Sequence, residues 1–287
     1  MNIVDRVRGL LYSLDIRPGE KTILAAVSGG KDSVAMLHIL ATLGYDVIPF
    51  HILLSEHESH LERAETVKKV SKLLGLEPVI VRLKDYLGFD ILEVAELDNS
   101  RRVCSDCGIA KRRIMNRYAI EHGIPIIATG HTLEDSLMFF IKNLMSGHIE
   151  LVPKVKPYRE GVPGIMAAKL KPLFYISERE TAEYVKRNYL PVAKKRCPFE
   201  KTDAKRFALK ELMRKFDELY AGGLKGLVKG MIRFIKTYCP QEREEVLNRC
   251  KICGGPTSPD REICTFCALK RRLEEKARKN ENEKTSK

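Results

Sequence analysis

The sequence has no run of eighteen apolar residues, roughly the length that a helix needs to cross a bilayer. Its first residues, MNIVDRVRGLLYSLDI, carry charges throughout, so they resemble neither a signal peptide nor a membrane anchor. Proline is scarce, at 13 residues of 287, and 44% of the residues are hydrophobic, which excludes a disordered protein. No internal repeat is present. We therefore expect a cytoplasmic globular protein with a sizeable core and no contact with a membrane.

The net charge is strongly positive, at +13. A basic excess of this size favours a polyanionic partner such as nucleic acid. The alternative is a surface rich in lysine and glutamate of the kind found in thermophiles, because charged residues make up 31% of the chain. Charge alone therefore does not choose the partner.

Apolar runs alternate with amphipathic stretches along most of the chain. Predicted strands cover 23–27, 46–53, 78–83 and 124–130, and predicted helices cover 1–18, 32–43, 62–74 and 108–122. Ser177 is expected to cap a further helix, with Glu180 completing a capping box. This alternation predicts an α/β fold with a doubly wound parallel sheet, followed by lysine-rich helices between about 200 and 240. In such sheets ligands bind beyond the carboxyl ends of the strands.

A glycine-rich loop follows the first predicted strand and opens a helix. It consists of Ser28, Gly29, Gly30, Lys31, Asp32 and Ser33. Glycines let the backbone approach a ligand closely, and the free N–H groups at the start of the helix face an anion. The loop lacks the spacing of the Walker P-loop. We interpret it as a phosphate-binding loop.

The eight cysteines are not expected to form disulfides, because cytosolic thiols stay reduced. The pair Cys104/Cys107 suits a zinc half-site, a redox pair or part of an iron–sulfur site, and two thiolates complete no common metal site. Because the chain also has the phosphate-binding loop, Cys197 in KKRCPFE is the best candidate for a third metal ligand. Three thiolates on a [4Fe–4S] cluster leave one iron without a protein ligand. Cys239 is interpreted as a structural thiol.

Two further C-x-x-C pairs lie close together near the end of the chain. The four residues are Cys250, Cys253, Cys264 and Cys267. Ten residues containing glycine and proline separate the pairs, and this spacing predicts four thiolates in a tetrahedron around a structural Zn²⁺. Such a zinc ribbon has no open coordination position, so we expect no chemistry there.

The loop SGGKDS resembles the signature of the PP-loop pyrophosphatase family, which cleaves ATP between its α and β phosphates to adenylate a substrate. The resemblance implies contacts with ATP, which we list by position. The nucleotide would be lined by Ala26, Val27 and Ser28, its adenine would be held by Ile52, and its ribose would approach Gly130. Asp32 would lie near the phosphates or their Mg²⁺. Lys31 would neutralise pyrophosphate.

The ordered set SGGKDS, CSDCGIAKRRIMNRYA, ATGHTLEDS, RCP and a C-terminal Cys₄ element resembles the tRNA 2-thiolation enzymes, closest to their thiouridine branch. The resemblance implies that the C2 carbonyl oxygen of a tRNA uridine is adenylated by ATP and then replaced by sulfur held on the cluster. Asp135 would be the catalytic carboxylate, and Lys111 would reach the nucleotide phosphates. The implied partners are tRNA, a ubiquitin-like sulfur-carrier protein and a second copy of the chain.

This resemblance divides the chain into segments. They are an N-terminal helix (1–20), a PP-loop ATP-binding catalytic domain (21–200), a basic helical region (201–245), a zinc ribbon (246–270) and a charged tail (271–287). The chain departs from the branch by starting with a helix rather than a Cys₄ zinc element, and by having Thr132 and Glu134 where Asn and Asp are usual.

Other functions fit parts of the same pattern. A PP-loop ligase that adds nitrogen to an adenylated carbonyl would use the loop but would not need Cys104, Cys107 and Cys197. Thiolation of a tRNA cytidine would use the same machinery on another base. A non-enzymatic RNA-binding module would need neither an intact loop nor Asp135. His51, His57 and His60 lie near a strand end without clear metal-ligand spacing, and we expect them to be surface or loop residues.

Overall fold

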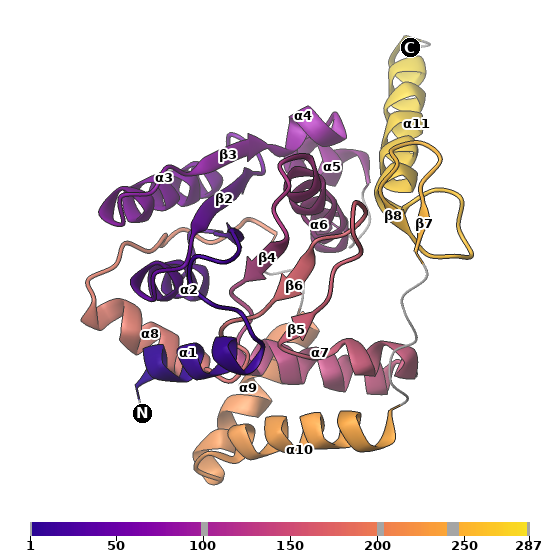
Figure 1. Ribbon diagram of the computed structural model, residues 1–287. Coiled ribbons are helices and arrows are strands. Elements are labelled where there is room, and N and C mark those ends of the chain that lie inside the picture. Colours follow the sequence, from indigo (N-terminus) through magenta and orange to yellow (C-terminus); the bar gives the residue numbers. More distant parts are fainter. Residues whose placement is uncertain (1, 99–102, 200–203, 240–246, 286–287) are drawn as a thin grey trace.

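The computed structural model describes residues 2–98, 103–199, 204–239 and 247–285. Its central sheet has the strand order β3-β2-β1-β4-β6-β5, and β5 alone runs antiparallel to its neighbour. The strands are β1 (Ile23–Ala26), β2 (Val47–Leu53), β3 (Val79–Arg82), β4 (Ile126–Thr129), β5 (Tyr158–Arg159) and β6 (Ala168–Leu170). Helices cover both faces of this sheet (Figure 1). The predicted doubly wound, mainly parallel α/β fold is confirmed.

Alternate residues of β1 enter two different hydrophobic cores. Ile23 and Ala25 belong to the core beneath the first helices, and Leu24 belongs to the core on the other face of the sheet. Because both faces are covered, the strand is apolar throughout rather than alternating. Complete burial of a large side chain such as Phe50 contributes about 1.5–3 kcal/mol.

The helices of this part of the chain follow the predicted order. They are α1 (Ile3–Ser13), α2 (Lys31–Thr42), α3 (Glu58–Leu73), α4 (Leu83–Leu87), α5 (Ile91–Leu97), α6 (Val103–Glu121), α7 (Leu133–Met145), the 3₁₀ helix η1 (Ile149–Lys154) and α8 (Glu178–Arg187). Helix α8 begins as expected: Ser177 accepts a hydrogen bond from the Glu180 N–H at 3.2 Å, and the Glu180 carboxylate accepts one from the Ser177 N–H at 2.9 Å. Helix α1 is shorter than the predicted 1–18 helix, with Asn2 and Leu14 as its caps, and α6 begins before the predicted 108–122 helix.

The C-terminal part of the chain is mainly helical, as predicted. It comprises α9 (Ala204–Leu219), α10 (Gly223–Tyr238), a hairpin of β7 (Asn248–Arg249) and β8 (Pro256–Thr257), and α11 (Thr265–Thr285). Helix α10 packs on α7 (Figure 1). None of the helices in the described ranges is long and apolar enough to span a membrane.

Helix α11 continues from the last cysteine pair through the segment predicted to be a charged tail. Its first half is docked on α5 and α6: Leu273 is fully buried, and Arg272 forms ion pairs with Asp106 at 2.8 Å and Asp98 at 3.1 Å. Lys276 also pairs with Asp98. These contacts hold the C-terminal element against the helix that carries Cys104 and Cys107.

Candidate functional site

Two features shape the glycine-rich loop. Gly29 has φ +77°, and a Cβ added there would lie 2.8 Å from the Arg63 carbonyl oxygen, so both the backbone angle and the space require glycine. The Ser33 hydroxyl accepts the Ser28 N–H at 3.1 Å and donates to the Gly30 carbonyl at 2.9 Å. Among the residues that the structure describes, no side chain caps α2 at Gly30, which leaves the first N–H groups of the helix to an anion.

A cleft of about 660 Å³ lies beside this loop, at the carboxyl ends of β1, β2 and β4. Most of the residues predicted for the site line it: Ala26, Val27, Ser28, Gly30, Asp32, Ser33, Ile52, Gly130, Asp135, Lys111, Cys104, Cys107 and Cys197. The cleft therefore joins the candidate nucleotide site to the candidate cluster site.

Cys197 reaches the cleft because its segment is fastened along the loop and α3. The Ala193 N–H donates to the Gly29 carbonyl at 2.9 Å, and the Lys194 and Lys195 N–H groups donate to the Glu62 carboxylate at 3.0 and 2.8 Å. These contacts were not predictable from spacing, because they join residues more than a hundred positions apart along the chain.

Cys104 and Cys107 enter the same cleft from the first turns of α6. The Cys104 thiol is exposed and donates to the Phe199 carbonyl at 3.4 Å, which brings it to the segment that carries Cys197. Burial raises the pKa of Cys107, and the Lys111 ammonium beside it acts in the opposite direction.

The three cleft thiols are a donor set that a cluster can use. Within the described part of the chain, the four sulfur atoms that lie within 4.8 Å of one another belong to Cys250, Cys253, Cys264 and Cys267, and the cleft thiols are not gathered so tightly. A [4Fe–4S] cluster takes cysteine thiolates as ligands and holds them farther apart than one ion does. The chemistry of this donor set therefore fits the cluster.

The expectation that the histidines near β2 are surface residues is wrong for two of them. His51 and His60 are 5% and 2% exposed, and both line the cleft. His51 Nδ1 lies 2.7 Å from the Val27 carbonyl oxygen, and burial lowers the pKa of His51 to about 4 despite this hydrogen bond. Burial, helped by the charges of His57 and Lys111, also lowers the pKa of His60 to about 4.

His60 contacts one of the three cleft cysteines. Its Nε2 lies 3.6 Å from Cys197 Sγ, and its Nδ1 lies 2.7 Å from Ser55 Oγ. The His57 N–H donates to the same Ser55 hydroxyl at 3.2 Å. In the tautomer in which the Ser55 hydroxyl donates to Nδ1, the single proton of a neutral His60 lies on Nε2 and faces the sulfur.

Asp135 lies in the first turn of α7, where Thr132 is the N-cap. Its Oδ2 accepts the Thr132 N–H at 3.3 Å, and its Oδ1 lies 3.4 Å from Lys210 Nζ. The departure at Glu134 has a structural reason, since its carboxylate accepts the Glu178 N–H at 3.0 Å and so caps α8. Asp135 thus presents a carboxylate, 13% exposed, to the cleft beside a lysine.

Lys31 does not line the cleft, although it belongs to the loop. Its ammonium lies 2.7 Å from Asp32 Oδ1 and 3.8 Å from Glu178 Oε2, on the side of α8. Burial raises the pKa of Asp32, and the Lys31 charge opposes that shift. Thr181 donates to the Asp32 carboxylate as well. Lys31 would therefore have to leave this ion pair to reach pyrophosphate.

Gly130 follows β4 and lies against the first turn of α2. A Cβ placed on it would lie 2.9 Å from both the N and the Cα atoms of Ser33. Close packing of backbone on backbone therefore requires this glycine, whether or not a ribose also approaches it.

Gly130→Ala is expected to lower the free energy of unfolding by about 1–3 kcal/mol, because the added methyl group overpacks a rigid contact. Denaturant unfolding measures this. The matched control is Gly9→Ala in α1, where nothing lies within 4 Å, and where alanine should add up to about 1 kcal/mol of helix propensity. Equal effects at the two positions would contradict the packing argument.

Sequence reasoning missed two basic residues of the cleft. Arg63 lies in α3 and donates to the Ser28 carbonyl at 3.4 Å, and Lys210 lies in α9 beside Asp135. No motif marks either residue, and a chain with 51 lysines and arginines offers many equivalent candidates.

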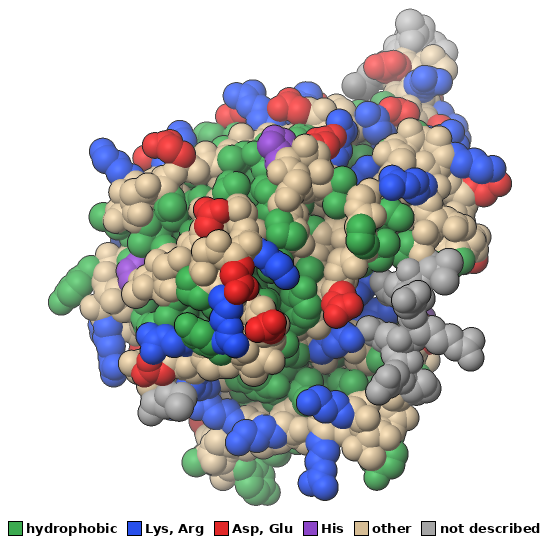
Figure 2. Space-filling model, viewed as in Figure 1, with side chains coloured by type: hydrophobic (Ala, Val, Ile, Leu, Met, Phe, Trp, Pro, Cys, Tyr) green, Lys and Arg blue, Asp and Glu red, His purple; other side chains and the backbone are tan. Residues whose placement is uncertain are grey.

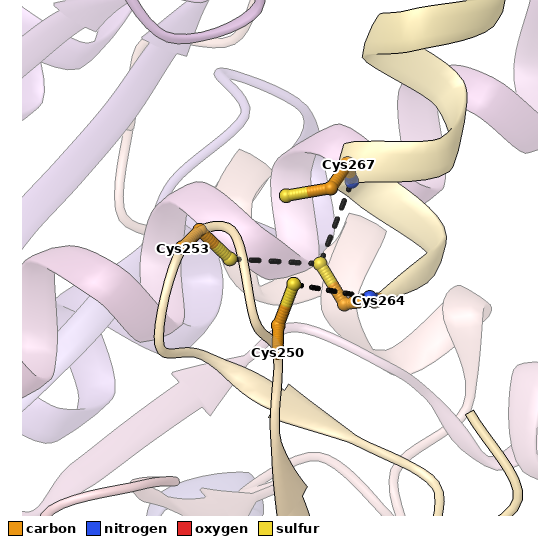
Figure 3. A group of neighbouring side chains, drawn as sticks. All are labelled: Cys250, Cys253, Cys264 and Cys267. Carbon is orange, nitrogen blue, oxygen red and sulfur yellow. Dashed lines mark hydrogen bonds between the residues drawn. The ribbon is translucent and has the colours of Figure 1, made fainter. Parts of the chain in front are cut away.

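The four C-terminal cysteines gather as predicted for a single-ion site (Figure 3). The Cys264 N–H donates to Cys250 Sγ at 3.2 Å, and Cys253 Sγ lies 3.6 Å from Cys264 Sγ. Burial raises the pKa of Cys250, but the surrounding backbone N–H donors outweigh it and lower the pKa to about 6. Arg113 of α6 donates to Cys253 Sγ at 3.3 Å, which ties this element to the helix of the cleft.

A phosphate-binding loop at the carboxyl edge of a parallel sheet defines a nucleotide-binding α/β protein. A family model described as a PP-loop domain matches residues 5–194. The tRNA-5-methyluridine(54) 2-sulfurtransferase of Pyrococcus horikoshii is 35% identical over 86% of this chain and 78% of its own length. The protein of the same name from Thermotoga maritima is 33% identical over 96% of this chain and 90% of its own.

A solved structure extends the likeness to three dimensions. The U34-tRNA thiolase NcsA from Methanococcus maripaludis, solved with its [4Fe-4S] cluster, superposes with a TM-score of 0.78 at 25% identity, covering 94% of this chain and 88% of that one. The chain therefore belongs to the PP-loop family, in the group of tRNA 2-thiolation sulfurtransferases.

Proposed function

We propose that this protein is an ATP-dependent tRNA sulfurtransferase that converts the C2 carbonyl of a tRNA uridine into a thiocarbonyl. The observation that carries the proposal is one cleft, in which the PP-loop and the thiols of Cys104, Cys107 and Cys197 lie together. A ligase that adds nitrogen would have no use for three thiols there. The names of the relatives support the choice of tRNA and of uridine.

The loop would bind ATP with Mg²⁺. Free N–H groups at the start of α2 would hold the phosphates, and Asp32 would carry Mg²⁺. Ala26, Val27 and Ile52 would line the nucleotide, and Lys111 would contact its phosphates. Lys31 would exchange its ion pair with Asp32 for the leaving pyrophosphate.

Asp135 would activate the uracil ring of the substrate. The O2 oxygen of uridine attacks the α-phosphorus only as the N3–H proton leaves, so a proton acceptor is needed. The Asp135 carboxylate is held by Thr132, faces the cleft and lies beside the Lys210 ammonium. Pyrophosphate leaves, and the adenylated O2 becomes a leaving group. Attack of sulfur on C2 then releases AMP and leaves a C=S bond.

Cys104, Cys107 and Cys197 would hold the [4Fe–4S] cluster. When bound, the cluster supplies an iron without a protein ligand, which can present sulfur to C2. The first turns of α6 and the segment after α8 bring the three thiols into the cleft that the loop also lines. His60 would donate its Nε2–H to the Cys197 sulfur.

His60→Phe is expected to weaken binding of the cluster. A chelator should remove iron about 10–100-fold faster, because removal of an outer hydrogen-bond partner of a metal ligand costs about that factor in metal affinity. His60→Gln, which keeps an N–H donor, should recover part of this stability. The absorbance of the cluster during chelator treatment measures the loss. Equal loss rates in His60→Phe and the wild type would contradict the hydrogen bond.

The C-terminal cysteines would bind a structural Zn²⁺, as their tight gathering suits one ion (Figure 3).

Figure 2 shows lysine and arginine side chains over α10, at the bottom of the view. This helix, GLKGLVKGMIRFIKTY, contains no acidic residue, so its outer face suits the phosphates of tRNA. A ubiquitin-like sulfur carrier, a homodimer and a cytoplasmic location complete the proposal, the last supported by relatives named cytoplasmic.

The test is a thiolation assay under anaerobic conditions with unmodified tRNA, ATP and a sulfide source. Formation of 2-thiouridine, detected by mass spectrometry of nucleosides together with AMP and pyrophosphate, would support the proposal. ATP cleavage coupled to incorporation of nitrogen would instead identify a ligase. Thiocytidine in place of thiouridine would change the target base but keep the mechanism.

A further inference from the structure

Arg63 of α3 is a cation of the cleft to which the mechanism above gives no part. Its side chain lines the cleft together with the phosphate-binding loop. Its Nη1 atom donates to the Ser28 carbonyl at 3.4 Å, and a Cβ built on Gly30 would lie 3.9 Å from the same nitrogen. Because α2 begins at Lys31, directly after Gly30, the guanidinium lies beside the first N–H groups of that helix, where an anion binds.

The hydrogen-bond donors of this guanidinium are incompletely used. Nη1 and Nη2 reach the carbonyl oxygens of Ser28 and Lys195, both at 3.4 Å, whereas N–H···O bonds usually measure about 2.7–3.2 Å. Nε is buried without a hydrogen-bond partner among the described residues, and in the same ranges Arg63 forms no ion pair with a carboxylate. The neighbouring Glu62 carboxylate instead accepts the Lys194 and Lys195 N–H groups. Arg63 therefore has donors available for a ligand that offers several acceptor oxygens.

A second cation lines the same cleft from another helix. Lys111 of α6 also borders it, and His51, at the carboxyl end of β2, lies within electrostatic range of both cations. Burial is the main reason that the pKa of His51 falls to about 4, and the charges of Lys111 and Arg63 lower it further. The positive charge that the two cations place near the loop suits the polyphosphate of a nucleotide.

Arg63 also differs from the lysine of the loop in its position. The Lys31 ammonium pairs with Asp32 and lies 3.8 Å from Glu178, on the side of α8, so it must break an ion pair to reach pyrophosphate. Arg63 lies beside the loop within the cleft and exchanges only two long hydrogen bonds to carbonyl groups for a phosphate. The geometry thus favours Arg63 as the cation that meets the phosphates first.

We propose that Arg63 binds the pyrophosphate part of ATP and stabilises the charge that develops on it during adenylation. This inference rests on the proposed function, in which ATP is cleaved between its α and β phosphates. As the uridine O2 bonds to the α-phosphorus, the bond from that phosphorus to the bridging oxygen breaks, and its electron pair leaves with pyrophosphate. A guanidinium can donate two parallel hydrogen bonds to phosphate oxygens, which stabilises this leaving group.

The test compares two nucleotides that differ in the pyrophosphate part. Dissociation constants are measured without tRNA, on anaerobically purified protein with Mg²⁺, for AMP and for α,β-methylene-ATP, which cannot be cleaved between those phosphates. In Arg63→Met we expect affinity for the ATP analogue to fall by about 10–100-fold, because charge-assisted hydrogen bonds are lost, and affinity for AMP to stay unchanged. Arg63→Lys should recover part of the loss, since it keeps the charge without the planar donors. The matched control is Lys72→Met, in the exposed last turn of the same helix, which should leave both constants unchanged.

Release of pyrophosphate in the presence of tRNA should also slow by about 100–1,000-fold in Arg63→Met, the cost of removing a donor from a developing charge. Iron per chain should match the wild type, because the backbone hydrogen bonds of residues 193–195 still fasten the segment that carries Cys197. Equal losses of affinity for the two nucleotides would overturn the inference, and so would unchanged affinity for both. Iron lost without any change in nucleotide affinity would assign Arg63 to holding that segment instead. A wild type that binds the ATP analogue but forms no 2-thiouridine would contradict the proposed function and leave the Arg63 contact standing.

Discussion

Cys197→Ala is expected to abolish both the cluster and the thiolation activity. Iron should fall from about four per chain to near zero, because Cys104 and Cys107 alone complete no iron–sulfur site. Thiolation should fall by more than about 100-fold. Loss of an outer hydrogen-bond partner of a metal ligand already lowers activity by up to about that factor, and loss of the ligand itself should cost more. Anaerobic purification followed by iron, sulfide and zinc analysis, together with the tRNA assay, measures these changes.

Cys239→Ala is the matched control. This thiol ends α10 and is partly buried against the core formed with α7, away from the cleft. Its loss should leave iron and activity near wild-type values and cost little stability. Iron retained in Cys197→Ala would remove Cys197 from the ligand set. Zinc without iron in the strictly anaerobic wild type would favour a cysteine-persulfide mechanism or a nitrogen-transferring ligase.

Cys264→Ser is expected to have the largest effect on stability, confined at first to the C-terminal element. Zinc should fall from about one per chain to near zero, because a structural site needs four ligands. Binding of structural Zn²⁺ contributes about 10–16 kcal/mol to small zinc-finger peptides, so the 248–273 region should lose its fold. Limited proteolysis and hydrogen exchange would show cleavage and rapid exchange there.

Iron should remain in Cys264→Ser, since the cleft thiols come from α6 and the segment after α8. Helix α6 also packs on α4, α5 and β4, which supports it without the C-terminal element. Ser258→Ala, in the turn between the two cysteine pairs, is a control that leaves all four thiols in place. Simultaneous loss of iron and zinc would show that the two metal sites are not independent.

Local features of the fold were predictable from neighbouring residues. Ser177 and Glu180 determine the start of α8 through a three-residue spacing, and Gly29 supplies a backbone angle that other residues avoid. Neither β5 nor β6 was predicted as a strand, because strands of two and three residues carry no periodic pattern. The pairing of Arg159 with Lys169 in the β5–β6 register was therefore not predictable from the sequence.

The cleft itself combined predictable and unpredictable parts. Residues that follow β1, β2 and β4 were expected to meet at one edge of the sheet, since all three strands are parallel. The burial of His60 was not predicted, because the 191–197 segment that lies against α3 is far from it in the sequence. The position of the Lys31 side chain on the α8 side of the loop was also not predictable, because it depends on Glu178, which is distant in the sequence.

The sequence by itself determined the motifs: the phosphate-binding loop, the C-x-x-C pairs and the alternation of strands and helices. Each of these depends on spacing within a few residues, which backbone geometry converts directly into local structure. The tertiary structure decided which motifs share a site. Cys197 lines the same cleft as Cys104 because residues 193–195 donate backbone hydrogen bonds to Gly29 and Glu62. Such contacts depend on how the whole chain packs rather than on any neighbouring residue.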